Sequence, residues 1–234
     1  MCACGSETTA EESRATLFTE LNPDSSGIGF RNDLALDSTF DVFRYRNYYN
    51  GGGVAIAELT GDTLEDIYVT SNIGWNRLYK NLGGLQFEDI TGASGAAGTH
   101  AWSTGVSVAD VDGDGLLDLY VCNSGDVGGD SRANELFVNL GDGRFEERAT
   151  DYGLADEGFS THAAFFDYDR DGDLDCYVLN NSFRPIATLG LRNIRHRRDD
   201  KGGDKLYRND GTSFVDVSEE AGIYGSVIGF GLGV

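Results

Sequence analysis

Basic residues are scarce in this chain, and long apolar runs are absent from it. Its 234 residues include 18 Lys and Arg against 39 Asp and Glu, which gives a formal net charge of −21. Nucleic acid is therefore not an expected partner, because binding it needs a basic surface that releases counterions. No stretch is long and apolar enough to cross a bilayer, so no membrane-spanning helix is predicted.

Familiar catalytic motifs are missing as well. The sequence has no nucleophile elbow, no His-Glu-x-x-His pair and no phosphate-binding loop. It has three histidines, and we interpret His162 as a packed residue rather than a catalytic base. No catalytic residue is predicted, and the sequence leaves enzyme activity open while favouring a non-enzymatic role.

Two nine-residue acidic loops are the strongest motifs that are present. They have acids at positions 1, 3, 5 and 9 and glycine at position 6, where the chain must reverse. Such closely spaced carboxylates repel one another unless a cation lies among them, and Ca²⁺ takes about 6–8 oxygen ligands. Position 7 would add its backbone carbonyl. The predicted calcium ligands are Asp110, Asp112, Asp114, Leu116, Asp118, Asp167, Asp169, Asp171, Asp173 and Asp175.

These loops are not EF-hands. Val121 and Val178 occupy position 12, where an EF-hand has a bidentate Glu, and the flanking segments have the composition of strands. We therefore predict that each loop connects two strands of a β-hairpin. A third, degraded copy has Thr63 in place of the glycine, and it would either bind calcium more weakly or be a relic held by hydrogen bonds. Its candidate ligands are Glu58, Thr60, Asp62, Leu64 and Asp66.

The acidic loops belong to a tandem repeat. Each is followed by a Leu-aromatic segment and then by a phenylalanine, at Phe87, Phe145 and Phe214. Four short strands per repeat predict an all-β fold made of β-propeller blades with four antiparallel strands. The predicted blades span roughly residues 50–98, 102–155 and 159–224, and the first strand of a fourth begins near residue 229. Residues 17–234 would then form part of a propeller, and residues 1–16 an acidic, flexible tether.

These repeats resemble the VCBS and FG-GAP repeats of the integrin α-subunit propeller superfamily, in particular a bacterial branch related to cartilage acidic protein. The resemblance is carried by the three acidic loops and by the segments Tyr49–Ala55, Trp102–Val108 and Thr161–Asp173. It covers roughly residues 17–234 and implies a calcium-binding propeller, usually of about seven blades. It implies little about biochemical activity.

The four cysteines bear on location. Cys122 and Cys176 follow the acidic loops at different offsets, which favours two buried thiols over a disulfide. Cys2 and Cys4 head an acidic stretch that resembles the start of a mature bacterial lipoprotein, with Cys2 as the lipidated residue. The alternative is a disordered tail with incidental cysteines. We expect an extracytoplasmic protein, either a bacterial outer-membrane lipoprotein or a secreted one, which touches a membrane only through this possible anchor.

The expected function is binding of an extracellular protein or glycan, with adhesion at the cell surface. One alternative is part of a lyase-like, polysaccharide-active propeller enzyme, for which Trp75, Trp102 and Tyr48 would supply a stacking platform for sugars. Another alternative is a structural spacer in a surface complex. A basic insertion between Phe183 and Lys205 would either bind an anionic partner or pair with local acids.

Overall fold

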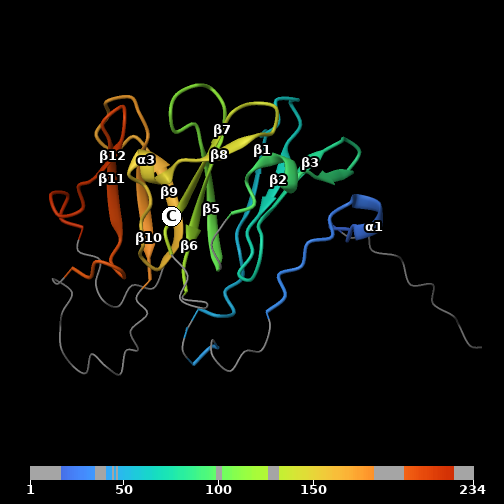
Figure 1. Cartoon of the computed structure of the whole chain (residues 1–234), viewed down its shortest axis with the longest axis horizontal. Helices are drawn as coiled ribbons and strands as arrows, with labels where there is room; N and C mark the ends of the chain where they lie inside the picture. The colour runs from blue at the N-terminus through green and yellow to red at the C-terminus, as the bar shows by residue number, and fades with distance from the viewer. Residues whose placement is uncertain are drawn as a thin grey trace, which may run out of the picture.

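The computed structural model of the chain is built from three four-stranded antiparallel sheets (Figure 1). It describes residues 17–34, 41–43, 45, 47–98, 102–125, 132–181 and 198–223. The first sheet contains β1 (Val54–Ala57), β2 (Asp66–Val69), β3 (Arg77–Asn81) and β4 (Phe87–Asp89). The second contains β5 (Ser103–Ala109), β6 (Asp118–Asn123), β7 (Glu135–Asn139) and β8 (Phe145–Glu147). The third contains β9 (Ser160–Phe166), β10 (Asp175–Asn180), β11 (Lys205–Asn209) and β12 (Phe214–Asp216).

Strands follow one another within each sheet as a meander, so the predicted all-β fold with four-stranded blades is confirmed. Each acidic loop joins the first two strands of a sheet, which confirms the predicted hairpin connections. These loops lie at the upper end of the sheets in Figure 1. The predicted tether, and the strand predicted near residue 229, lie outside the described residues.

The core lies between neighbouring sheets. We call the side of a sheet that packs on the following sheet its trailing face, and the opposite side its leading face. Between the first two sheets, a trailing face with Tyr68 and Leu78 packs on a leading face with Leu119, Val121 and Phe137. The next interface repeats the pattern, and its buried residues include Tyr120, Leu136, Val178 and Tyr207. Stacked apolar faces of this kind are how propeller blades bury their surface.

The first strands of adjacent sheets approach one another closely at two glycines. A Cβ atom on Gly53 would lie 2.9 Å from the carbonyl oxygen of Thr104, and one on Gly105 would lie 2.4 Å from that of Thr161. Only glycine fits at such distances. His162, at the equivalent position of the third sheet, is half-buried, and burial lowers its pKa.

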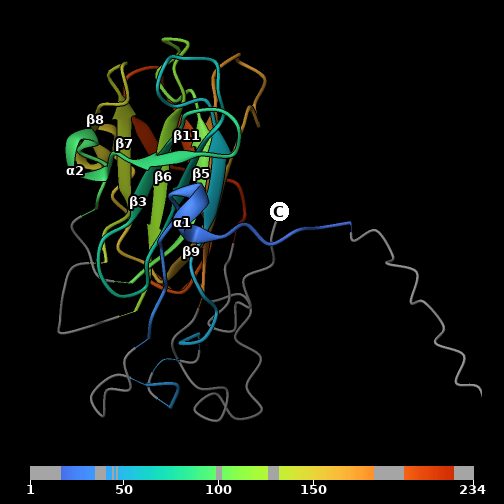
Figure 2. The ribbon, with the colours of Figure 1, turned by 90° about the vertical axis from the view of Figure 1, so that its right-hand side faces the viewer.

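Three four-residue helices precede the sheets in a repeating manner that the sequence analysis missed. They are α1 (Pro23–Ser26), α2 (Thr91–Ser94) and α3 (Ala149–Tyr152), and each ends in a left-handed glycine. A Cβ atom on the capping glycines at 27, 95 and 153 would meet the carbonyl oxygens of Phe87, Phe145 and Phe214, respectively, at 2.1–2.6 Å. Each helix therefore packs on the last strand of the sheet that follows it, as Figure 2 shows for α2 beside β7 and β8.

Two further expectations have clear outcomes. Cys122 and Cys176 are buried free thiols, as predicted. The predicted sugar platform is wrong, because Trp102 and Tyr48 are buried against each other with ring centroids 5.0 Å apart, and only Trp75 is exposed. Among the described residues, no helix has the length and apolarity needed to cross a membrane.

Candidate metal sites

The loop between β5 and β6 gathers carboxylates from three of its predicted positions. Asp110, Asp112 and Asp118 each offer an oxygen, and these oxygens all lie within 4.8 Å of one another. Backbone amides shape the turn around them: Asp110 accepts hydrogen bonds from the N–H groups of Gly113 and Gly115, at 2.8 and 2.9 Å. Three acidic oxygens at this spacing suit a hard cation such as Ca²⁺.

The loop between β9 and β10 repeats the arrangement. Oxygens of Asp167, Asp169 and Asp175 lie within the same 4.8 Å of one another. In addition, Oδ1 of Asp173 is buried without a hydrogen-bond partner. A buried carboxylate oxygen among other carboxylates is costly to leave unpaired, and a bound cation would satisfy it. The residues of both loops therefore fit the calcium that the sequence predicts.

The electrostatics of the two loops agree with this fit. Burial, with the charges of Asp112 and Asp114, raises the pKa of Asp118 to about 6. Partial burial and the neighbouring Asp171 likewise raise the pKa of Asp173 to about 6. Negative charge is thus disfavoured in these loops as they stand, and a divalent cation reverses that preference.

The aspartate at position 9 has a structural role in all three loops. Asp118 accepts hydrogen bonds from the backbone N–H of Val111 within the loop and from that of Asn139 at the end of β7, both at 2.8 Å. The side chain of Asn139 in turn donates to the carbonyl oxygen of Leu117 at 3.0 Å. The same pairs recur as Asp66 with Asn81 and Asp175 with Asn209.

These asparagines are site residues that the sequence analysis did not assign. Their recurrence before a turn glycine, at Asn81, Asn139 and Asn209, was the available signal. They hold each acidic loop against the third strand of its own sheet, so the loop keeps its shape through contacts outside the carboxylate cluster.

The degraded loop between β1 and β2 is held differently. Glu58 Oε1 accepts hydrogen bonds from the N–H groups of Thr60, Gly61 and Asp62, at 2.6–3.2 Å. Lys80 Nζ lies 3.0 Å from Asp62 Oδ2. The pKa of Asp62 is lowered, first by a backbone hydrogen bond from Leu64 and second by the ammonium group of Lys80. This loop therefore contains a cation of its own, in the form of a lysine side chain.

Backbone conformation explains the glycines of the motif. Position 6 is left-handed in all three loops, with φ of 90° at Gly115, 104° at Gly172 and 73° at Thr63. Position 4 is left-handed too, and in the loop between β9 and β10 this position is Arg170, with φ of 68°. The sequence analysis identified the requirement at position 6 but missed the one at position 4.

Replacing Thr63 with glycine is expected to stabilise the protein. A β-branched residue in the left-handed region costs about 1–2 kcal/mol of strain, which glycine relieves. Glycine also gives the unfolded chain more conformational entropy, and this offsets about 0.5–1 kcal/mol of that gain. The net gain of up to about 1 kcal/mol should raise the melting temperature by roughly 2–4 °C. Differential scanning calorimetry measures it. Thr212→Gly, at an exposed turn position without positive φ, should lower the melting temperature instead; an equal change in both variants would contradict the strain argument.

The remaining predicted residues are placed as follows. Asp114 and Asp171, at position 5, lie outside the two carboxylate triads, and Asp114 Oδ1 accepts the N–H of Leu116 at 2.8 Å. They remain predicted ligands, as do the carbonyl groups at position 7. The two intact loops border one hollow of about 510 Å³, which Asp112, Tyr152 and Asp173 help to line. Cys2 lies outside the described residues.

Comparison with known proteins agrees with the repeat. A model described as "FG-GAP-like repeat" matches residues 58–121 and 125–178, together just over half of the chain. Cartilage acidic protein 1 of Mus musculus is 27% identical over 192 residues, which are 80% of this chain and 28% of that protein. The protein of the same name from Xenopus tropicalis is 26% identical over 195 residues, 82% of this chain and 29% of that one. The chain thus spans less than a third of the length of these relatives.

Proposed function

Because the chain belongs to the FG-GAP-like repeat family, we propose that it is a calcium-stabilised, β-propeller-like module that binds a protein or glycan partner outside the cell. The observation that supports calcium most directly is the pair of carboxylate triads, in equivalent loops of two sheets. The similarity to cartilage acidic proteins supports the extracellular location. Lipidation of Cys2 remains a prediction.

Calcium would act structurally in this proposal. When bound, the ion neutralises the clustered carboxylates and links both ends of the loop. The chain's own residues then do the rest. Asp118 and Asp175 tie each loop to the third strand through Asn139 and Asn209, so that metal binding strengthens the hairpins that form the blades.

The partner would bind at the opposite end of the sheets, where the second strand connects to the third. The described ends of these connections, next to β2, β6 and β10, lie away from the acidic loops because strands alternate in direction along each meander. A glycan array combined with a lyase assay tests this part of the proposal. Glycan binding without an unsaturated product supports a binding module, whereas an unsaturated product would establish the lyase-like enzyme.

Calcium stoichiometry tests the metal part. Isothermal titration calorimetry is expected to give two calcium ions per chain. The degraded loop should bind none, because the ammonium group of Lys80 already pairs with Asp62 there. Lys80→Met should add a third, weaker site, since it frees Asp62 beside Thr60, whose Oγ1 is buried without a hydrogen-bond partner.

The matched control is Arg208→Met, at the equivalent position of the third sheet. The carboxylate that Arg208 pairs with, at 2.7 Å, is that of Asp210, which lies outside the acidic loop 167–175, so the stoichiometry should stay at two. Three ions in the unchanged protein, or two in Lys80→Met, would show that the lysine does not replace a cation. No heat of binding at all would refute the calcium proposal.

A further inference from the structure

An open hollow of about 560 Å³ lies at the end of the first sheet that is away from the acidic loops. It is bounded by the connection before β3, the start of β3, the end of β4, and α2 with the segment after it. The lining residues are Trp75, Arg77, Asp89, Thr91, Gly92 and Ala97. Because α2 also packs on β8, this hollow borders the junction between the first two sheets. Its volume is within the range of about 300–1,000 Å³ that is typical of small-ligand sites.

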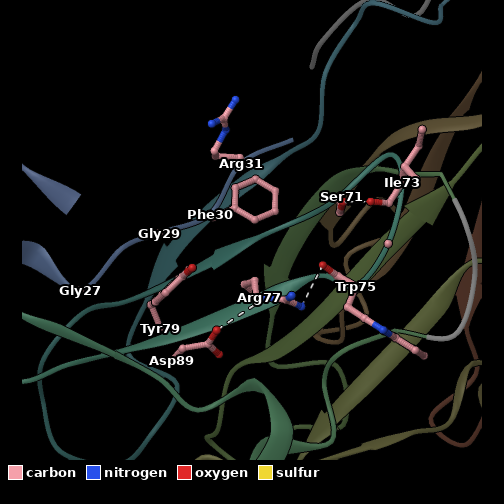
Figure 3. Close-up of a pocket in the computed structure, with 11 residues that line it drawn as sticks. Gly27, Gly29, Phe30, Arg31, Ser71, Ile73, Trp75, Arg77, Tyr79 and Asp89 are labelled. Carbon is pink, nitrogen blue, oxygen red and sulfur yellow. Dashed lines mark hydrogen bonds and ion pairs between the residues drawn. The ribbon is translucent and has the colours of Figure 1, made fainter. Parts of the chain in front are cut away.

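Trp75 gives this hollow an exposed aromatic surface. The three-residue sugar platform predicted from the sequence does not form, but the side chain of Trp75 is 58% exposed. Figure 3 shows its indole turned away from Phe30 and Tyr79. Within the described part of the chain, the indole N–H has no hydrogen-bond partner. An exposed indole can stack on the apolar face of a sugar ring while its N–H donates to a hydroxyl group.

The turn that presents Trp75 is held by hydrogen bonds on both sides. Asn76 Oδ1 accepts the backbone N–H of Ser71 at 2.9 Å, and Ser71 Oγ donates to the carbonyl oxygen of Ile73 at 2.9 Å. The backbone N–H of Asn76 donates to the carbonyl oxygen of Ala97 at 2.9 Å. A ligand that stacks on Trp75 therefore meets an ordered turn, and little conformational entropy is lost on binding.

The guanidinium of Arg77 lies beside the indole with donors to spare. Nη1 donates to the carbonyl oxygens of Trp75 and Asn76 at 3.2 and 3.1 Å, and Nε lies 3.5 Å from Asp89 Oδ2 (Figure 3). Nη2 makes no hydrogen bond to any residue that the structure describes. The other oxygen of Asp89 accepts the N–H of Thr91 at 3.0 Å. The unpaired groups here are thus N–H donors, one of them on a cation, which favours a carboxylate ligand.

We propose that this hollow is a subsite for an acidic oligosaccharide, with a hexuronate ring stacked on Trp75 and its carboxylate bound by Arg77. The inference rests on the proposed function, and it names a ligand class for the end of the sheets where that function places the partner. An acidic peptide fits less well. Apart from Trp75 the lining is polar or small, so it offers no apolar recess for a peptide side chain to fill.

Isothermal titration calorimetry with β-1,4-linked tetraglucuronate, in saturating calcium, tests the subsite. Cellotetraose is the matched neutral ligand, because it has CH₂OH groups in place of the carboxylates. Tetraglucuronate should bind roughly tenfold to a hundredfold more tightly, which is the effect of hydrogen bonds between a guanidinium and a carboxylate. Tryptophan fluorescence should change on binding, since Trp75 is exposed and the second tryptophan, Trp102, is buried.

Variants assign the two contacts separately. Arg77→Gln should remove the preference for tetraglucuronate and leave cellotetraose binding unchanged. The control Arg144→Gln makes the same change at an exposed position between β7 and β8 and should have no effect. Trp75→Ala should weaken binding of both sugars, whereas Trp75→Tyr, which keeps an aromatic surface, should retain most of it.

Four results would overturn the subsite: equal affinities for the two sugars, unchanged fluorescence, a preference that survives Arg77→Gln, or full binding by Trp75→Ala. Tetraglutamate that binds as tightly as tetraglucuronate would also overturn it, in favour of an acidic peptide. The proposed function fails by different measurements. A glycan array that identifies a neutral sugar would leave that function standing without this subsite, and the calorimetric count of calcium ions does not depend on Trp75 or Arg77.

Discussion

Removing calcium is expected to lower the melting temperature by roughly 10–20 °C. Extracellular calcium modules bind with dissociation constants of about 10⁻⁴–10⁻³ M. At about a hundredfold excess of calcium over the tighter value, each occupied site adds about 2.7 kcal/mol to the free energy of unfolding. Two sites add roughly 5 kcal/mol, and a chain of this size gains about 2–4 °C per kcal/mol. Melting curves recorded by circular dichroism, in calcium and in chelator, measure the difference.

Single variants divide this effect between the loops. Asp112→Asn and Asp169→Asn each remove one charged oxygen from a triad, so each should remove about half of the difference between calcium and chelator. The double variant should remove nearly all of it. Glu146→Gln is a matched control, since it neutralises an exposed acid outside the loops and should leave the difference unchanged. Equal melting of the unchanged protein with and without chelator would refute calcium stabilisation.

Replacing Lys205 with methionine is expected to destabilise the protein by about 3 kcal/mol, because it leaves a buried carboxylate without its partner. That carboxylate belongs to Asp156, which enters the interface between the second and third sheets. Its side chain is fully buried, pairs with Lys205 and accepts a hydrogen bond from Asn180 at 2.8 Å. Urea denaturation at neutral pH measures the loss.

A second substitution identifies the cause. Asp156→Asn added to Lys205→Met removes the orphaned charge while the amide oxygen still accepts from Asn180, so most of the lost stability should return. A loss that persists in the double variant would indicate that the lysine acts through packing of its aliphatic chain rather than through its charge.

Features encoded within a few neighbouring residues could be predicted from the sequence. The acidic loops, their position in hairpins and the four-stranded repeat all follow from aspartate, glycine and β-branched residues at short, fixed spacings. Asp110, Asp112 and Asp118 come together because a nine-residue turn leaves them little alternative. The left-handed Arg170 escaped prediction because nothing in its side chain marks that conformation.

Features that depend on the next repeat could not be read in this way. The burial of Trp102 against Tyr48 joins segments from different parts of the chain, and neither residue type indicates whether it will be exposed. The helices α1, α2 and α3 are too short to give a periodic pattern, and their role is apparent only where their glycines meet the following sheet. The ion pair between Lys80 and Asp62 likewise depends on strand register, which brings β3 beside the loop between β1 and β2.

The alternation of strand direction has a consequence for how such a chain can diversify. The acidic loops lie at one end of every sheet, and at the other end the second strands finish and the third strands begin, with residues 70–76, 124–134 and 181–204 between them in the sequence. These three connections differ greatly in length, whereas all three acidic loops have nine residues. Insertions and substitutions can therefore accumulate at one end of the sheets without disturbing the acidic loops at the other. New recognition properties can arise on this scaffold while the acidic loops keep their nine-residue length.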